Sequence, residues 1–179
     1  VSMFDNVEFP DEPAPSDKWI LGELYQLINQ CKKGYQDYDF YIPANAIREF
    51  TRNLFAAHYI ELVKSRAYST NDNRGRNSAI NTLHYCFSTI LTLLSPICPF
   101  ITEQLWTKIY SSKSIHNERM PKFQNRYVDM RKFTALIIEF NSSVWASKKD
   151  TVSMKTGKSL SLRDQTDIKI PIELSLIHI

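Results

Sequence analysis

The stretch LSPICPFITEQLWTKIY, residues 94–110, decides the fold of this chain. Proline has no amide proton, so it ends a helix or occupies the first turn of the next one. We therefore predict that Pro96 stops an apolar helix and that Pro99 starts a second, amphipathic helix. The predicted apolar stripe of that second helix consists of Ile101, Leu105, Trp106 and Ile109. Two stops so close together predict a tight corner between two buried helices.

Apolar residues at helical spacing extend this pattern along most of the chain. They predict helices over residues 17 to 35, 43 to 64, 76 to 94, and 133 to 148, in addition to the helix after Pro99. Five amphipathic helices joined by short connections can bury their stripes only against one another. The expected fold is therefore all-α, an antiparallel helical bundle.

The two ends of the chain differ in composition from the predicted bundle. Residues 1 to 16 combine prolines with acidic residues, which predicts an extended linker following an upstream domain. Near the C-terminus, residues 168 to 172 alternate apolar and polar side chains, and Pro171 confines such a strand to a sheet edge. We expect a linker (1–16), a bundle (17–150), and a truncated basic connection with a small β appendage (151–179).

The composition excludes several classes of protein. The chain has no run of about 18 apolar residues, and its N-terminus lacks the layout of a signal peptide. Its three cysteines have no zinc-site spacing, and we interpret them as small buried hydrophobes. The four glycines form neither GxGxxG nor a P-loop. We expect a soluble, cytoplasmic protein that has no metal or cofactor of its own.

No group of residues predicts catalysis. His58 and Glu61 could meet on one helix face, as in di-metal bundles, but the remaining ligands of such a site are missing. We therefore predict a structural hydrogen bond for His58 and a boundary position for His84. The stretch SMKTGKS at residues 153–159 has the wrong spacing for a synthetase nucleotide loop. An enzyme with an unrecognised bundle site stays possible, but it would need a deep polar pocket and a bound ion.

Basic and aromatic residues alternate after the predicted corner. Residues 113 to 163 carry eleven Lys and Arg against four acidic residues, a local net charge of +7. Cations neutralise phosphates and exposed aromatic rings stack on unpaired bases, which favours single-stranded RNA as the partner. A solvated basic surface is the plainer alternative, and the aromatic residues could belong to the core.

Four segments in this order resemble one family. They are DKWIL (17–21), FTRNLFAAHYIELVKSRAY (50–68), LSPICPFITEQLW (94–106) with SIH (114–116), and FNSSVWASKK (140–149) with GKSLSLRD (157–164). The chain resembles the anticodon-binding domain of class Ia aminoacyl-tRNA synthetases, most closely the archaeal type of valyl-tRNA synthetase. DKWIL and PFITEQLW are shared with isoleucyl enzymes, whereas ELVKSRAY and SIH favour the valyl family.

The resemblance implies a function for the bundle and a larger parent enzyme. The expected partner is tRNA, specifically valine tRNA, bound through its anticodon arm. The parent would be an ATP-dependent valine–tRNA ligase that uses ATP and magnesium, acts as a monomer, and carries its catalytic and editing domains upstream in cis. This chain would itself be non-catalytic. The alternatives are an isoleucyl-tRNA synthetase anticodon domain, or a non-catalytic helical scaffold that binds an acidic protein partner.

The expected RNA-binding residues lie in three places. Lys64 and Arg66 are at the end of the second predicted helix, and Lys148 and Lys149 are at the end of the fifth. The main candidate is the basic-aromatic segment 119–131. Its predicted contact residues are Arg119, Lys122, Phe123, Arg126 and Arg131. Lysine and arginine would position the anticodon arm through its phosphates, while bases would be read by stacking and hydrogen bonds.

Overall fold

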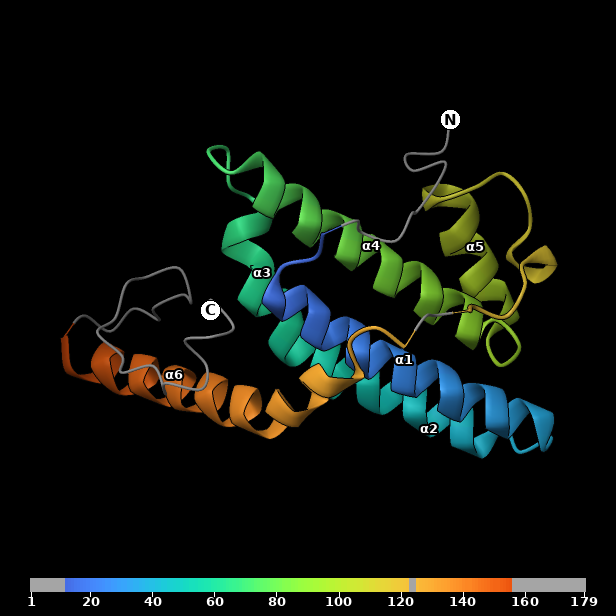
Figure 1. Cartoon of the computed structure of the whole chain (residues 1–179), viewed down its shortest axis with the longest axis horizontal. Coiled ribbons are helices and arrows are strands. Elements are labelled where there is room, and N and C mark those ends of the chain that lie inside the picture. Colours follow the sequence, from blue (N-terminus) through green and yellow to red (C-terminus); the bar gives the residue numbers. More distant parts are fainter. Residues whose placement is uncertain (1–11, 123–124, 156–179) are drawn as a thin grey trace.

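The computed structural model describes residues 12–122 and 125–155, with side chains as far as residue 146. All regular structure within these residues is helical, which confirms the all-α prediction (Figure 1). The elements are α1 (Pro15–Gln36), α2 (Tyr41–Glu49), η1 (Phe50–Tyr59), α3 (Ile60–Ala67), α4 (Asn73–Leu94), α5 (Pro99–Ile109), η2 (Ile115–Asn117), η3 (Val128–Phe133) and α6 (Thr134–Lys155). The predicted β appendage lies outside the described residues.

Helix α1 is central to the bundle and packs against α2, α4 and η3. Ile20, Leu24 and Cys31, on its predicted apolar stripe, are fully buried, whereas Tyr35 at the end of that stripe is half-buried. Trp19 and Leu21 on another side of the helix are buried as well. A helix that is covered on several sides must be apolar on several sides. Cys31 and Cys86 are buried, as predicted for small hydrophobes, whereas Cys98 is half-buried.

The predicted second helix is one continuous rod with a change of winding in its middle. α2, η1 and α3 follow one another without a break, and η1 is a π-helix. The third helix begins three residues earlier than predicted, at Asn73. The reason is a cap: the Asp72 side chain accepts a hydrogen bond of 2.8 Å from the amide of Gly75.

At the corner between α4 and α5, the first helix ends before Pro96 and the second begins at Pro99, as predicted. α4 ends at Leu94, whose carbonyl accepts hydrogen bonds of 2.9 Å from the amides of residues 97 and 98, and Pro99 is the first residue of α5. The prediction that α5 is a buried helix is wrong. Ile101 is 50% exposed, and Thr102 is the residue of α5 that is buried. Among the described elements, α5 packs mainly against α4 and η2, which leaves part of its surface exposed.

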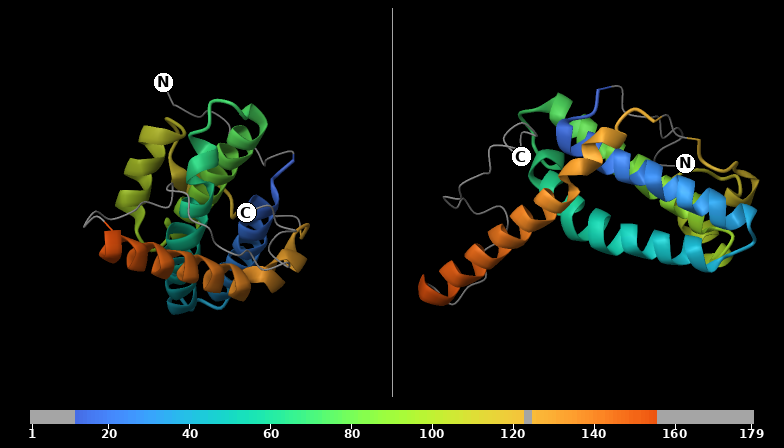
Figure 2. Two further views of the ribbon diagram at one scale, coloured as in Figure 1. Left: turned by 90° about the vertical axis from the view of Figure 1, so that its left-hand side faces the viewer. Right: turned by 60° about the horizontal axis from the view of Figure 1, so that its bottom comes forward.

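Helix α6 extends away from the body of the bundle (Figure 2). Near its start, the Asn141 side-chain amide donates a hydrogen bond of 3.2 Å to Nδ1 of His58 on η1. The predicted structural hydrogen bond of His58 is thereby confirmed. Glu61 pairs instead with Lys64 at 3.2 Å. The described part of the chain holds no group of three or more side chains suited to a metal ion, and none of its helices is long and apolar enough to span a bilayer.

Candidate nucleic-acid interface

A hollow of about 590 Å³ lies between the segment preceding α1, the start of α4 and Tyr127. We call it the proximal hollow, and its cations are Lys18 and Arg74. The Lys18 ammonium nitrogen lies 5.9 Å from the centre of the Tyr127 ring, within the range of a cation–π contact. The two acidic residues of the hollow are both bound: Glu12 pairs with Arg74, and Asp72 caps α4. The hollow thus contains two basic and two acidic residues beside an aromatic face, and Arg74 is already paired within it.

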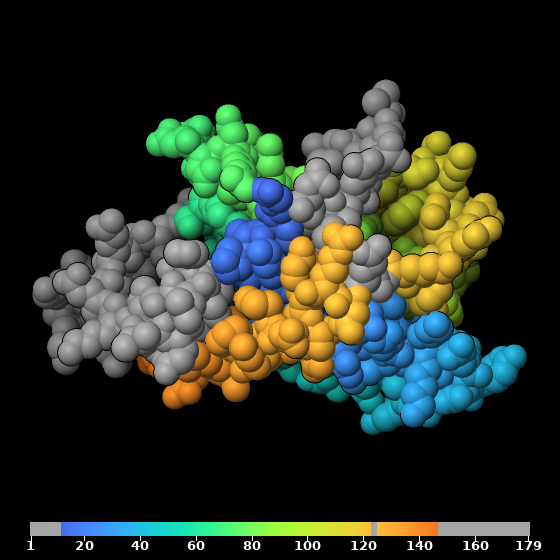
Figure 3. All heavy atoms as spheres, in the orientation of Figure 1, coloured from blue at the N-terminus to red at the C-terminus, as the bar shows by residue number. Residues whose placement is uncertain are grey.

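The basic-aromatic segment follows η2 and ends in η3, which packs against α1 (Figures 1 and 3). Arg119, Lys122 and Arg126 are all exposed. Within the described residues, none of these three side chains forms an ion pair. Arg126 directly precedes Tyr127, so the end of the segment borders the proximal hollow. The predicted contact Phe123 lies outside the described residues.

Arg66 has a partner inside the protein. The Asp17 carboxylate is fully buried and accepts hydrogen bonds from both terminal nitrogens of Arg66, with 3.0 Å to Nη1. It also accepts from the Tyr59 hydroxyl at 2.8 Å and from the hydroxyl of Ser78. Burial and the neighbouring carboxylate raise the pKa of Tyr59 well above its usual value, so the phenol stays protonated. The predicted RNA contact Arg66 is therefore engaged in joining α1, η1, α3 and α4.

Arg131 is likewise engaged within the fold. Its Nε lies 3.3 Å from a carboxylate oxygen of Glu23, and its Nη1 lies 3.4 Å from the side-chain oxygen of Gln26. The Glu23 carboxylate also accepts a hydrogen bond of 2.5 Å from Thr134, whose hydroxyl accepts one of 2.9 Å from the Trp19 indole. These bonds attach η3 and the start of α6 to α1.

Glycine allows the chain to approach α1 closely at the end of the basic-aromatic segment. A Cβ on Gly22 would lie 2.4 Å from the carbonyl oxygen of Tyr127, which is closer than two such atoms can approach. Any larger residue at position 22 would push Tyr127 outward. The small residue therefore sets the position of the aromatic ring that lines the hollow.

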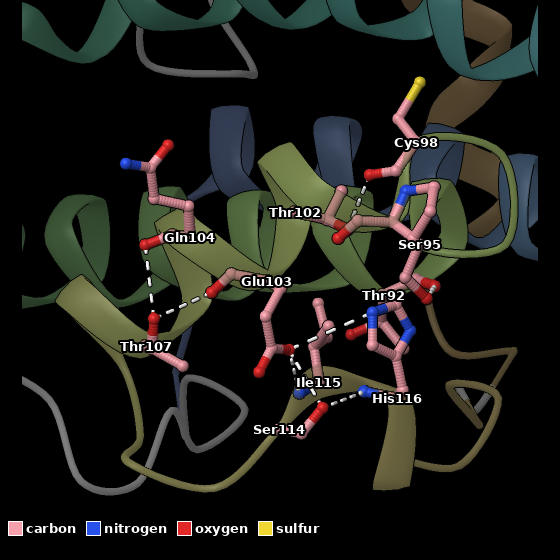
Figure 4. Close-up of polar contacts among 11 residues, drawn as sticks. Thr92, Ser95, Cys98, Thr102, Glu103, Gln104, Thr107, Ser114, Ile115 and His116 are labelled. Carbon is pink, nitrogen blue, oxygen red and sulfur yellow. Dashed lines mark hydrogen bonds and ion pairs between the residues drawn. The ribbon is translucent and has the colours of Figure 1, made fainter.

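The start of the basic-aromatic segment is held by helix α5 (Figure 4). The Glu103 carboxylate accepts hydrogen bonds of 2.9 Å from the Ser114 hydroxyl and 3.0 Å from the Ile115 amide. Nε2 of His116 lies 4.0 Å from the same carboxylate, and Ile115 is buried. Two of the diagnostic segments, PFITEQLW and SIH, thus contact each other directly and position the chain just before Arg119.

The structure describes the side chain of Lys64 but not those of Lys148 and Lys149. The Lys64 side chain is 42% exposed and pairs with Glu61, three residues away on the same helix. Lys148 and Lys149 lie in α6, and their side chains are outside the description. Of the predicted residues whose side chains are described, Arg66 and Arg131 are engaged inside the fold, whereas Arg119, Lys122 and Arg126 are exposed.

Sequence reasoning missed Lys18, Arg74 and Arg76. The first stands beside Asp17 in DKWIL, and the other two lie just before and at the start of the helix predicted over residues 76 to 94. The structure places both arginines in the first turns of α4. Cations are unfavourable at a helix N-terminus because the helix dipole is positive there. Two arginines just after Asp72, a residue type that favours the N-cap position, were thus an available signal for an anionic partner.

The chain matches the family model described as the anticodon-binding domain of tRNA ligase over residues 17–164. It is 36% identical to the valine–tRNA ligase of Pyrobaculum aerophilum in an alignment that covers 93% of this chain and 20% of that protein. It is 32% identical to the Nanoarchaeum equitans valine–tRNA ligase over 90% of this chain, and 35% identical to that of Aeropyrum pernix over 83%. The chain spans about a fifth of the length of these relatives, and their names do not favour the isoleucyl or scaffold alternatives.

Proposed function

The chain belongs to the family of anticodon-binding domains of tRNA ligases, and from this membership we propose that it binds the anticodon arm of valine tRNA. The parent protein would be a cytoplasmic, monomeric valine–tRNA ligase that consumes ATP with magnesium. Its catalytic and editing domains would lie elsewhere in the same polypeptide, and this chain would contribute no catalytic residue. The names of the relatives support this proposal.

The observation that carries the proposal is the exposure of Arg119, Lys122 and Arg126, three cations that we call the basic row after their order in the sequence. It is attached to the bundle at both ends, by Glu103 near its start and by Arg131 beyond Tyr127. Because the segment is fixed at both ends before RNA binds, the cations can contact phosphates with a smaller loss of conformational entropy on binding. The proximal hollow next to it offers Tyr127 and Lys18 to an unpaired nucleotide.

The other predicted contacts have different parts in this proposal. Arg66 and Arg131 would support the surface from inside, because each guanidinium is engaged with a buried carboxylate. Lys64 could exchange Glu61 for a phosphate, since such a surface pair is worth little. Phe123, Lys148 and Lys149 remain predicted contacts.

The salt dependence of RNA binding tests the proposal. Binding of a valine tRNA anticodon stem-loop would be measured between about 50 and 200 mM salt for the chain and for the variant R119E/K122E/R126E. Each lost phosphate contact should reduce the steepness of the log Kd against log salt plot by roughly 0.7 to 0.9. We expect weaker binding and a slope that is flatter by about 2 to 3.

A matched control separates a local contact from general attraction. The variant K32E/K33E/R52E makes the same change in net charge at three exposed positions outside the basic-aromatic segment. It should weaken binding less and leave the slope nearly unchanged. An unchanged slope in R119E/K122E/R126E would remove the basic row from the interface. Equal effects of the two variants would show that only overall charge matters.

A further inference from the structure

Glu103 is an acidic residue placed beside the segment that carries the basic row. It is the fifth residue of α5, and its carboxylate reaches across to η2 (Figure 4). One oxygen, Oε2, accepts two hydrogen bonds, of 2.9 Å from the Ser114 hydroxyl and of 3.0 Å from the Ile115 amide. We call these two bonds the Glu103 clamp. A carboxylate repels phosphates, so its position next to a phosphate-binding surface needs a physical reason.

The first turn of α5 fixes the backbone from which the clamp starts. Pro99 is the first residue of the helix. The hydroxyl of the fully buried Thr102 donates a hydrogen bond of 2.8 Å to the carbonyl of residue 98. Glu103 follows directly, and its side chain is 35% exposed. The carboxylate is therefore carried by a rigid turn while it stays outside the hydrophobic core.

The η2 side of the clamp is anchored independently by apolar packing. Ile115 is 1% exposed and belongs to a small buried cluster with Tyr110 and a residue of α4. The Ser114 oxygen also accepts a hydrogen bond of 3.2 Å from the amide of His116, which caps η2. Removal of the Glu103 carboxylate would therefore leave the apolar contacts in place and loosen the backbone at residues 114–118.

Arg119 is the member of the basic row that lies closest to the clamp along the chain. It is four residues beyond Ile115, and four residues of extended chain span at most about 14 Å. The amide of Glu118 donates a hydrogen bond of 3.0 Å to the carbonyl of Ile115, which shortens this tether. Between η2 and η3 the described residues form no helix or strand, so the anchored ends determine the course of the segment.

Charge and positioning predict opposite effects of Glu103 on RNA binding. Its negative charge repels phosphates, and neutralising it would strengthen binding slightly, because charges more than about 8 Å apart are largely screened at 0.15 M salt. The clamp orders the backbone before RNA arrives, and its loss would weaken binding, because the backbone would then be ordered at the expense of the binding free energy. Both bonds end on Oε2. The amide oxygen of glutamine can accept the same two bonds without the charge, so Glu103→Gln separates the two effects.

We propose that Glu103 is a positioning residue for RNA binding, one that raises the affinity of the basic row for phosphates although its own charge opposes them. This inference rests on the proposed function of the basic row. It gives helix α5 and its proline corner a part in RNA binding, because Pro99 and Thr102 fix the turn from which Glu103 reaches η2. Glu103 itself contacts no RNA; it acts through the position of the segment that follows η2.

Stem-loop binding at about 0.15 M salt tests the proposal. The Kd for the valine tRNA anticodon stem-loop would be compared between the 179-residue chain and its variants. We expect Glu103→Ala to bind about three- to tenfold more weakly, and Glu103→Gln to bind like the unchanged chain. Glu118→Gln is the charge control, because Glu118 is exposed and directly precedes Arg119, and it should bind equally or more tightly. Gln104→Ala changes an exposed residue of the same helix and should have no effect.

Two further measurements identify the route of the effect. In the R119E/K122E/R126E background, Glu103→Ala should cause no further loss of binding, because it acts through the basic row. Hydrogen exchange of the amides of residues 115–118 in the free chain should accelerate in Glu103→Ala and not in Glu103→Gln. If Glu103→Ala does not fold, Ser114→Ala removes only one of the two bonds and should give a smaller loss of binding in the same direction.

Three results would overturn the proposal. Unchanged or tighter binding by Glu103→Ala would show that the clamp does not support RNA binding. Equally weak binding by Glu103→Ala and Glu103→Gln would show that the position of the acceptor oxygen is irrelevant. A full additional loss in the R119E/K122E/R126E background would place the effect of Glu103 outside the basic row. The proposed function fails separately, if stem-loop binding does not depend on the basic row, and the exchange of residues 115–118 still measures the clamp in that case.

Discussion

Replacing Asp17 with asparagine tests the polar centre of the bundle. The Asp17 side chain is 0% exposed, and its carboxylate accepts hydrogen bonds from Tyr59, Arg66 and Ser78. It also accepts from the amide of Ala14 at 3.2 Å, at the start of α1. Asparagine has nearly the same shape but carries no charge. The substitution therefore leaves the Arg66 guanidinium without its counter-charge.

The expected loss follows from the burial of the two partners. Removing one member of a buried ion pair costs about 3–5 kcal/mol, because the other charge is left uncompensated. The Arg66 side chain retains 20% exposure, so water can relieve part of this penalty. We expect a decrease in the free energy of unfolding of about 3 kcal/mol. For a chain of this size the melting temperature should fall by roughly 6–12 °C.

Urea and thermal unfolding, followed by circular dichroism, would measure this loss. Glu61→Gln is the matched control, because it removes a carboxylate from the exposed pair with Lys64 and should cost less than about 1 kcal/mol. The double variant D17N/R66M should lose less than the sum of its two single variants, since it leaves no buried charge behind. The reasoning is refuted if Asp17→Asn costs no more than Glu61→Gln, or if the double variant is additive.

Three further predictions concern other contacts. Gly22→Ala should lose about 1–3 kcal/mol of stability and accelerate amide exchange in η3, because its Cβ would meet the Tyr127 carbonyl; a neutral result would contradict this close approach. Thr134→Val should cost about 1–3 kcal/mol in urea unfolding, because it leaves the Trp19 indole without an acceptor; the exposed Thr107→Val is the control. Burial lowers the pKa of His58 and His84 below 6.5, so protonation of these imidazoles favours the unfolded state. The melting temperature should therefore fall as the pH drops below about 6.5, and it should fall less steeply in His58→Gln. A melting temperature that does not change with pH would exclude this linkage.

The helices were predictable from the sequence because periodicity and punctuation are local properties. Pro99 begins α5 as expected, and the apolar residues from Ile20 to Cys31 lie on the buried side of α1. The extent of burial was less predictable. Ile101 fits the helical period of α5, but it stays half exposed in the described part of the chain, where α5 packs mainly on α4 and η2. A period shows which residues share a face and cannot show whether a neighbour packs against it.

The candidate RNA-binding residues show the same division. The sequence identified a basic-aromatic segment, and the structure exposes Arg119, Lys122 and Arg126 in it. Arg66 and Arg131 looked equivalent to them in the sequence. Each is engaged with a carboxylate of α1 that lies 49 or 108 residues away. Residue type alone cannot distinguish an exposed cation that could bind a phosphate from one that forms an ion pair with a buried carboxylate.

The sequence by itself determined the helical class of the chain, the corner at residues 94–99, and the family to which the four diagnostic segments point. These features depend on the missing amide proton of proline, on the 3.6-residue period, and on residue order. Only the tertiary structure decided which charges are engaged inside the bundle and which remain on its surface. It also brought Lys18 and Arg74 to one hollow. Such groupings depend on how helices distant in the sequence pack together, and no local pattern encodes that packing.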